Sequence, residues 1–200
     1  MNVEIAILFC EDSGTYSYFK GLHLWGIEKD ARLYKGPYSV IAHPPCQLWG
    51  KMAPINYKRW GGEHNRPGND GGCFESALWS VEMFGGVLEH PAYSKAWERY
   101  KLDRPEKGKW TKSRSGWVCE VWQSAYGHVA NKATWLYCVS DKKPYDLDWR
   151  RLKGTHQIGG ADQRGKNKNK PTIRGKKASE TPILFAIELI RLVIYSNKNL

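Results

Sequence analysis

The sequence has few cysteines and no long apolar run, and both absences exclude classes of protein. The longest apolar stretch, residues 183–195, is interrupted by Glu188 and Arg191 and falls short of the ~18 residues of a membrane span. The five cysteines are an odd number without CxxC spacing, and the start of the chain lacks the features of a signal peptide. These features predict free thiols in an intracellular, reducing compartment and no integral membrane segment.

Acidic residues are scarce relative to basic ones. Asp and Glu total 20 against 31 Lys and Arg, which gives a formal net charge of +11, and the excess lies in residues 101–200. The chain also carries 10 Trp and 11 Tyr. A basic surface combined with many flat aromatic rings indicates a nucleic-acid partner. The length of 200 residues, the ordinary share of hydrophobic residues and the absence of repeats predict one globular domain over residues 1–200.

Two buried strands are predicted in the first half of the chain. Residues 3–9 form an apolar stretch that ends in a polar turn, and residues 38–42 form a second one that is stopped by His43 and two prolines. The short stretch between them leaves room for one compressed crossover. Cys46 is therefore expected just beyond the carboxyl end of a strand, where ligands and catalytic groups collect in open α/β sheets.

The rest of the chain alternates between helix and strand patterns. Apolar spacing predicts helices over residues 73–84 and 183–195, and residues 61–72 are rich in glycine and asparagine and predict an exposed loop. Shorter apolar runs predict strands, at residues 87–88, 118–125 and 134–139. This order indicates an α/β fold.

The segment Pro44-Pro45-Cys46-Gln47 has the clearest chemical meaning. Two prolines fix the backbone as it leaves a strand and present the next side chain in one orientation, which suits a nucleophile. Taken alone, the pattern is weak, since a cysteine after prolines is more often a small core residue. Glu89, at the end of the predicted strand 87–88, has a similar structural alternative as an exposed or capping carboxylate.

Four segments in order resemble the cytosine-5 DNA methyltransferases. The first is the loop with Pro44-Pro45-Cys46-Gln47, and the others are residues 86–90 (GVLEH), 124–136 (SAYGHVANKATWL) and 177–182 (KASETP). The chain is also similar to a group of phage-type proteins in residues 42–46, 85–91 and 132–137. The resemblance implies a reduced, single-domain, Rossmann-like methyltransferase sheet and, for a phage protein, a place in the cytoplasm of a bacterial host.

The resemblance implies a covalent mechanism. A thiolate from Cys46 would add to carbon 6 of a cytosine, Glu89 would protonate ring nitrogen 3, and carbon 5 would then accept a methyl or other one-carbon group. His90 stands where the family has asparagine, and Lys132 corresponds to a family arginine, whereas Thr134 replaces a second one. The implied catalytic residues are Cys46, Glu89, His90 and Lys132.

The implied cofactor is S-adenosylmethionine. The family's glycine-rich first loop is replaced here by Glu11-Asp12-Ser13-Gly14, which predicts weak binding of a carboxylate-bearing ligand, or binding only together with DNA. The acidic residue expected on the ribose is Asp30, Glu28 or absent. The cofactor-binding residues by this resemblance are Phe9, Asp12, Asp30, Pro44 and Ser179.

The basic loop at residues 161–178 is the predicted nucleic-acid contact. Its segment 164–177 carries seven basic side chains and no acid. Such a run is usually a solvated face, but the overall charge imbalance favours phosphate binding. Trp49, beside the cysteine loop, is expected to line a pocket for a flipped base. The predicted contacts are Trp49, Lys166, Lys168, Lys170, Arg174, Lys176 and Lys177.

Two other interpretations stay open. The potential metal ligands match no zinc spacing, so no metal is expected; they are His43, Cys46, His64, Cys73, His90 and His128. The chain could instead be a methyltransferase-fold protein that binds DNA or a nucleotide without catalysis, for example to block a host nuclease. The altered first loop favours this alternative, whereas Cys46 together with Glu89 favours an enzyme acting on cytosine in DNA, duplex or single-stranded, or in a nucleotide. The sequence does not indicate an oligomeric state.

Overall fold

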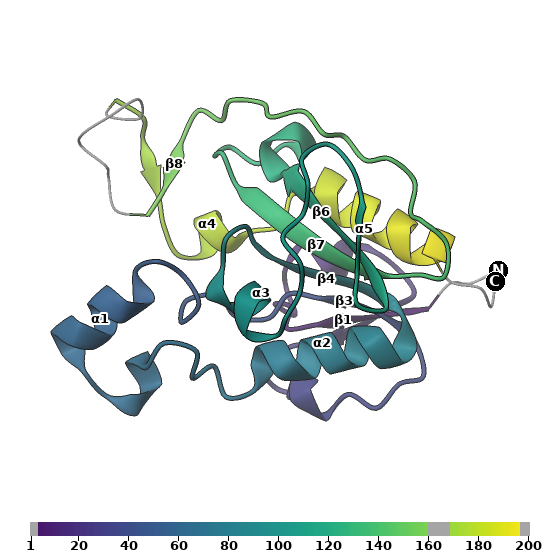
Figure 1. Cartoon of the computed structure of the whole chain (residues 1–200), viewed down its shortest axis with the longest axis horizontal. Helices are drawn as coiled ribbons and strands as arrows, with labels where there is room; N and C mark the ends of the chain where they lie inside the picture. Colours follow the sequence, from purple (N-terminus) through teal and green to yellow (C-terminus); the bar gives the residue numbers. More distant parts are fainter. Residues whose placement is uncertain (1–3, 160–168, 197–200) are drawn as a thin grey trace.

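The computed structural model describes residues 4–159 and 169–196, which form a seven-stranded mixed sheet with helices on both faces (Figure 1). The strand order is β2-β1-β3-β4-β7-β6-β5. The first four strands in this order are parallel, and the remaining ones pair antiparallel. The strands are β1 (Ile5–Leu8), β2 (Leu22–Trp25), β3 (Ser39–Ala42), β4 (Gly86–Pro91), β5 (Thr111–Ser113), β6 (Gly116–Trp122) and β7 (Ala133–Val139).

Short helical elements connect the strands. The α-helices are α1 (Ala53–Trp60), α2 (Cys73–Phe84), α3 (Lys95–Arg99), α4 (Lys176–Ser179) and α5 (Ile183–Ser196). Four 3-10 helices accompany them: η1 (Thr15–Tyr18), η2 (Ala31–Leu33), η3 (Glu63–Asn65) and η4 (Gln123–Tyr126). A separate two-stranded ribbon, β8 (Gln157–Ile158) with β9 (Thr172–Ile173), lies outside the main sheet.

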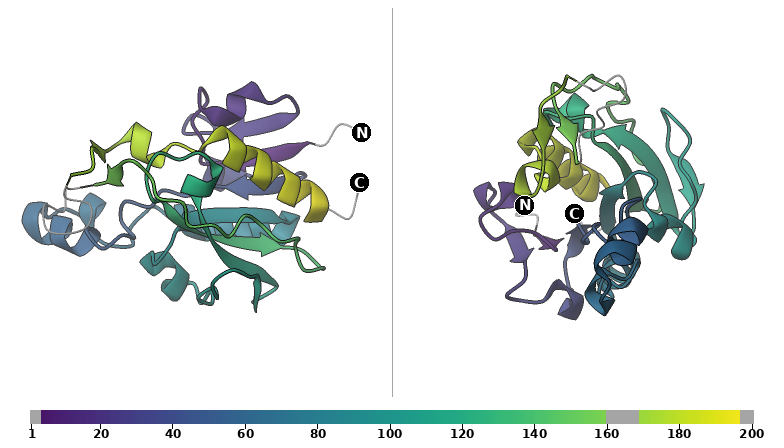
Figure 2. Two further views of the ribbon diagram at one scale, coloured as in Figure 1. Left: turned by 90° about the horizontal axis from the view of Figure 1, so that it is seen from above. Right: turned by 90° about the vertical axis from the view of Figure 1, so that its left-hand side faces the viewer.

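The α/β expectation is confirmed, and the two long helices cover opposite faces of the sheet. Figure 2 shows α5 on one face and α2 on the other. Side chains alternate along the central strands, so that Leu8 and Ala42 join the α2 core while Ile7 and Ile41 join the α5 core. The architecture is compatible with a Rossmann-like fold. Within the described ranges, no helix has both the length and the apolar character needed to cross a membrane.

The expectation of a single crossover between the first two predicted strands was wrong. The chain forms β2 between β1 and β3, and it makes both crossovers with the 3-10 helices η1 and η2 in place of α-helices. β2 and β3 pair with opposite edges of β1, so the strand order reverses beside β1. Such a reversal opens a crevice at the carboxyl ends of the strands, where ligands bind in open α/β sheets.

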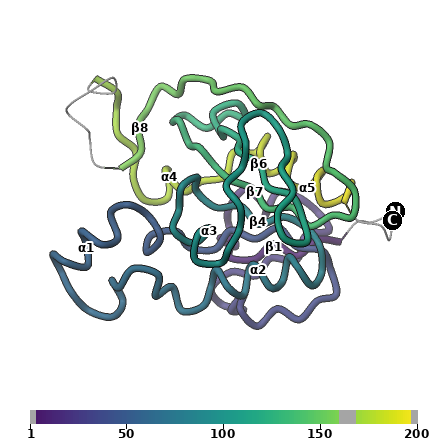
Figure 3. The backbone as a smooth tube through the Cα atoms, in the orientation of Figure 1, coloured from purple at the N-terminus to yellow at the C-terminus, as the bar shows by residue number. Residues whose placement is uncertain are grey.

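The helix prediction was accurate for α2 and α5, but it missed α1. Residues 61–72, predicted as loop, contain the short helix η3. Figure 3 shows that the chain between β3 and α2 leaves the body of the molecule and returns to it, with α1 at the far end of this excursion. Ala53 is the one buried residue of α1. An exposed helix lacks the apolar stripe by which helices are recognised in a sequence.

Gly86 is required where β4 pairs with β3. Its φ is +121°, and a Cβ atom added there would lie 2.0 Å from the carbonyl oxygen of Val40. We expect Gly86→Ala to lower the free energy of unfolding by at least ~3 kcal/mol, because both the backbone conformation and the strand contact must change. Urea denaturation measures this. Gly108→Ala is the matched control, since Gly108 also has a positive φ but open space around it; a similar loss in both variants would contradict the strand-contact argument.

Candidate functional site

Polar side chains gather at the carboxyl edge of the parallel strands. His43 directly follows β3, and Glu89 lies in β4, the next strand of the sheet. Glu89 is only 7% exposed. The strand prediction placed Glu89 beyond a strand end, whereas β4 continues to Pro91 and the carboxylate projects from within it. The site therefore lies beside the crevice where the strand order reverses.

A hydrogen-bonded chain of four side chains fixes Glu89. His43 Nδ1 lies 3.0 Å from Glu89 Oε2, and its Nε2 lies 2.8 Å from the hydroxyl of Tyr16. On the other side, Gln123 Nε2 donates to Glu89 Oε1 at 3.0 Å and to Thr134 Oγ1 at 2.9 Å. Because a carboxylate only accepts, His43 donates from Nδ1 to Glu89. Both oxygens of the carboxylate are thus held in place.

Glu89 is ionised at neutral pH. Burial alone would raise its pKa, but the hydrogen bond from His43 and the positive charge of Lys132 outweigh burial and lower the pKa of Glu89 to about 2. Burial and the negative charge of Glu89 in turn raise the pKa of Tyr16 well above its ordinary value. The phenol therefore keeps its proton and can donate it to His43.

Cys46 lies near the same carboxylate but holds its proton. Pro44 is buried and Pro45 is exposed, so the chain turns outward directly after β3, and Cys46 is half-buried at this turn. Burial and the charge of Glu89 raise the pKa of the Cys46 thiol, and Lys132 opposes both effects. Cys46, Glu89 and Lys132 are thus electrostatically coupled at this edge, with the proton on sulfur and the charge on the carboxylate.

Lys132 joins this edge to the C-terminal segment. Its Nζ donates to the carbonyl oxygens of Ser179 and Glu180 at 3.2 and 3.4 Å. Nearby, Thr15 Oγ1 donates to the carbonyl oxygen of Thr181 at 2.6 Å. The segment between α4 and α5 is therefore anchored across the strand ends, and the Lys132 ammonium is held near Cys46 and Glu89.

His90 does not belong to the site. Because side chains alternate along a strand, His90 points away from Glu89 into the core beneath α2, where it is 0% exposed and contacts Phe74. Burial lowers the pKa of His90 to about 4. The predicted catalytic role of His90 is wrong for this reason.

The buried His90 predicts acid sensitivity of the fold. Its pKa is lower in the folded chain than the ordinary 6.5, so the unfolded chain binds the proton first and stability falls as pH drops from 6.5 toward 4. At pH 5 we expect a loss of about 2 kcal/mol relative to pH 7. Urea denaturation of wild type and His90→Leu at both pH values measures it. An equal loss in the variant would assign the sensitivity to other groups.

Trp49 is not available to line a base pocket. The indole is 3% exposed, packs against Phe74 and Tyr100, and donates from Nε1 to Asp70 Oδ2 at 2.9 Å. The same carboxylate accepts from the backbone N–H of Phe74 at the start of α2. Trp49 therefore anchors the loop after Cys46 to α2, and the expectation of base stacking on it was wrong.

The residues predicted for S-adenosylmethionine do not form a site for it. Asp30, expected on the ribose, has both oxygens engaged by Arg32. The ends of β1 and β2 close on each other, since a Cβ on Gly26 would lie 2.8 Å from the carbonyl oxygen of Cys10 and 3.0 Å from the carboxylate of Asp12. The strand ends therefore pack directly against each other here, with the carboxylate of Asp12 beside Gly26.

The other predicted cofactor residues add no donors for the amino-acid part of the ligand. Phe9 has a φ of +59°, so a bulky residue occupies the strained position at the end of β1. Pro44 is buried, and Ser179 is exposed with its hydroxyl donating to carbonyls of its own helix. Glu11 pairs with Lys176 at 2.7 Å. An acidic loop in which Glu11 already pairs with Lys176 does not favour a carboxylate-bearing cofactor.

We expect calorimetry on the free protein to show no submicromolar binding of S-adenosylmethionine. The acidic first loop gives the reason, because its carboxylates repel a carboxylate-bearing ligand. Asp30→Ala should leave the weak titration unchanged, because that carboxylate already serves Arg32. Tight binding by wild type that Asp30→Ala weakens would contradict this result.

Part of the basic loop, including Arg164, Lys166 and Lys168, lies outside the described residues. Of the remaining predicted contacts, Lys170 precedes β9, Arg174 directly follows it, and Lys176 and Lys177 lie on α4. Lys170 Nζ donates to the carbonyl oxygen of Gly154 at 2.7 Å, and Lys176 pairs with Glu11. Two of these cations thus have partners within the chain.

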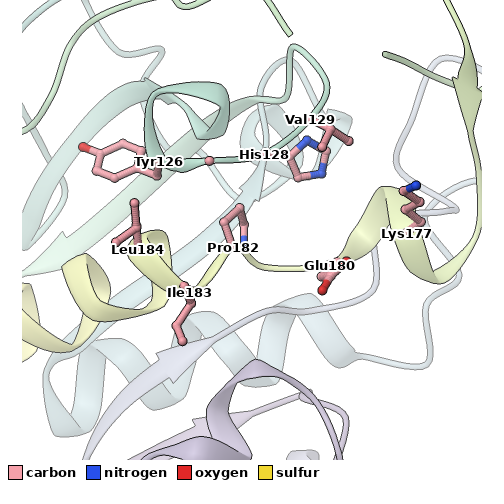
Figure 4. A pocket seen from close by; sticks show the side chains of 9 residues that line it. Tyr126, His128, Val129, Lys177, Glu180, Pro182, Ile183 and Leu184 are labelled. Atoms are coloured by element: carbon pink, nitrogen blue, oxygen red, sulfur yellow. The ribbon is translucent and has the colours of Figure 1, made fainter. Parts of the chain in front are cut away.

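A pocket of about 270 Å³ lies beside the C-terminal segment (Figure 4). It is lined by Tyr126, His128 and Lys177 and by the start of α5. His128 Nδ1 accepts from the backbone N–H of Ala130 at 3.0 Å, so the ring braces its own loop. The pocket does not include Cys46 or Glu89, and the catalytic candidates therefore lie outside this hollow.

Sequence reasoning missed three members of the hydrogen-bonded chain. His43 was considered only as a metal ligand, and Tyr16 and Gln123 were not considered. Their positions are far apart in the sequence and lie in 3-10 helices or just after a strand. The one available signal was His43 itself, a polar residue directly before the two prolines. Within residues 4–159 and 169–196, no three His, Cys, Asp or Glu side chains are grouped so that they could hold a metal ion.

No protein-family model matches the sequence, and the comparison with curated proteins gives no match either.

Proposed function

We propose that the protein modifies a pyrimidine base, cytosine in nucleic acid in particular, through covalent addition of Cys46 to carbon 6 of the ring. The observation that supports this most is the buried carboxylate of Glu89, which His43 of the Cys46 loop holds at 3.0 Å and which is electrostatically coupled to Cys46 and Lys132. A thiol and a buried carboxylate are the pair of groups that addition to the C5–C6 double bond requires. The sequence resemblance to cytosine-5 methyltransferases points to the same chemistry.

The protonation states define the first step of the proposal. The S–H bond of Cys46 breaks as the sulfur bonds to carbon 6, and Glu89 relays the proton to nitrogen 3 in the same step, because a carboxylate with a pKa of about 2 does not keep the proton itself. Electrons of the C5–C6 bond move through carbon 4 to nitrogen 3, which takes the proton from Glu89. Glu89 thus acts first as a base and then as an acid, whereas the sequence suggested an acid alone.

The surrounding residues hold this carboxylate and tune its charge. His43 and Gln123 fix its two oxygens, which leaves its remaining lone pairs for the thiol and the ring nitrogen. Tyr16 fixes His43 in turn. Lys132 lowers the pKa of both Cys46 and Glu89, and so favours the charge that develops on sulfur.

Addition of the thiol makes carbon 5 a nucleophile. It would then bond to the carbon of an electrophilic one-carbon donor, whose leaving group departs with the bonding electron pair. Water would take the proton from carbon 5 as the C5–C6 double bond forms again and Cys46 leaves as a thiolate, and Glu89 would return the proton of nitrogen 3 to that thiolate. Since the residues at β1 and β2 do not fit S-adenosylmethionine, no step is assigned to that cofactor.

A binding protein on the same fold is the second candidate. Two observations favour it: both oxygens of Glu89 are engaged by protein donors, and the pKa of the Cys46 thiol is raised. In that case the hydrogen-bonded chain is a buried structural network. The enzyme would produce a modified base, whereas the binding protein would leave every base unchanged.

Mass spectrometry of nucleosides from cells that express the protein tests the proposal. DNA and RNA are digested separately and compared with those of cells carrying an empty vector. We expect a cytidine or deoxycytidine derivative whose added mass identifies the transferred group. Nucleosides identical to the control, with the folded protein present in the cells, would favour the binding protein.

A further inference from the structure

Helix α1 projects beyond the carboxyl edge of the sheet and exposes apolar and aromatic side chains to solvent. Figure 1 shows it at the far end of the excursion that begins at the Cys46 loop. Trp60 is 63% exposed, and Met52, Ile55 and Tyr57 are exposed as well. Large apolar side chains gathered on a projecting element mark an interaction site.

All charged side chains of α1 and the residues just before it are basic. Residues 51–60 contain Lys51, Lys58 and Arg59 and no acidic residue. The guanidinium of Arg59 lies over the ring of Trp60, 5.2 Å from its centroid. Cations interleaved with exposed aromatic rings are the composition of a surface that binds a polynucleotide strand, since the rings stack on bases and the cations neutralise phosphates.

A groove connects α1 with the Cys46 loop. Its volume is about 640 Å³, and it is lined by Leu48 and Gly50, which follow Cys46, and by Pro54 of α1. Three cations, Arg66, Lys95 and Arg99, line the same groove. Its two acids pair with two of these cations, Glu63 with Arg66 at 3.5 Å and Glu98 with Lys95 at 2.9 Å, so Arg99 carries the excess positive charge of the groove.

We propose that this groove and helix α1 bind a single-stranded polynucleotide, with phosphates along the groove and a base stacked on Trp60. The inference rests on the proposed function in that it makes the substrate base part of a strand and not a free nucleotide. An unpaired strand fits better than a duplex because exposed rings stack on bases whose faces are open. The alternative occupant is a partner protein, which would need a strongly acidic surface to pair with the cations of α1 and the groove.

Fluorescence anisotropy with a labelled single-stranded oligonucleotide tests the inference on the full chain. We expect Trp60→Ala to weaken binding about tenfold. Lys58→Gln combined with Arg59→Gln should reduce the magnitude of the log–log salt slope by about 1.4, since each phosphate contact on a single strand contributes ~0.7. A free cytidine nucleotide should compete poorly with the oligonucleotide.

The chain offers a matched control away from α1. Lys35 lies over the ring of Trp79 at 5.0 Å, and Trp79 is 41% exposed on α2. Lys35→Gln combined with Trp79→Ala removes the same chemistry and should leave strand binding unchanged. Equal effects at the two places would overturn the proposal, as would tighter binding to a duplex that Trp60→Ala does not weaken.

Two further outcomes separate this inference from the proposed chemistry. If the α1 variants change the sedimentation of the protein and not its oligonucleotide affinity, the helix is an interface between copies of the chain and the inference is wrong. If the variants lose strand binding as expected while wild type forms no covalent adduct with cytosine, the strand interface stands and the covalent mechanism fails.

Discussion

Cys46→Ser should lower the rate of base modification by about 10³-fold or more, because serine keeps the shape and hydrogen bonding of the thiol but is a far weaker nucleophile. The proton that leaves sulfur in the first step would have to leave a hydroxyl, whose acidity is much lower. The measurement is the content of modified nucleoside in cells that express equal amounts of wild type and variant.

Cys73→Ser is the control for this prediction. Cys73 is also a partly buried free thiol whose pKa is raised by burial, but it begins α2 and does not lie at the edge of the sheet with Glu89. We expect this variant to modify bases as wild type does. Modification that survives in Cys46→Ser, with folding and stability unchanged, would make Cys46 a structural thiol.

Glu89→Gln should lower modification by about 10²- to 10⁴-fold, the usual contribution of a positioned acid–base group. The amide can still hydrogen-bond to the ring, but it cannot take the proton from Cys46 and deliver it to nitrogen 3. Because the charge of Glu89 contributes to the raised pKa of Cys46, the variant should also titrate its thiol at lower pH. The pH dependence of thiol alkylation measures this shift.

Glu120→Gln is a stringent control for Glu89. Glu120 is equally buried, at 7% exposure, and lies on β6 of the same sheet, where it accepts from Trp135 and Arg151. Removal of its charge should leave both the modification and the thiol titration unchanged. If the two variants lose activity alike, the loss reports damage to the sheet rather than a role of Glu89.

The sequence predicted those parts of the fold that repeat a simple pattern. Residues 73–84 carry apolar side chains at helical spacing, and α2 has the predicted ends because Gly72 and Gly85 flank it. β2 was missed because its four residues mix a histidine with leucines and are only partly buried. α1 was missed because it is exposed to solvent, so its sequence lacks the apolar stripe that a packed helix carries.

The candidate site was predicted where local chain geometry determines it. Cys46 follows two prolines after a strand, and Glu89 was recognised from its place in a family-like segment. A prediction of β4 at its full length would have shown that Glu89 and His90 face opposite sides of the sheet, because side chains alternate along a strand. The roles of Tyr16 and Gln123 could not be predicted from the sequence, because these residues join the site through tertiary contacts between distant segments.

Covalent trapping tests the central claim most directly. Wild type is incubated with an oligonucleotide that carries cytosine with fluorine at carbon 5, together with the low-molecular-weight fraction of a cell extract to supply the one-carbon donor. Fluorine cannot leave carbon 5 as a proton does, so we expect a stable complex whose peptide map places the base on Cys46 and which Cys46→Ser does not form. Absence of any adduct under conditions where the protein is folded and bound to the oligonucleotide would contradict the covalent mechanism.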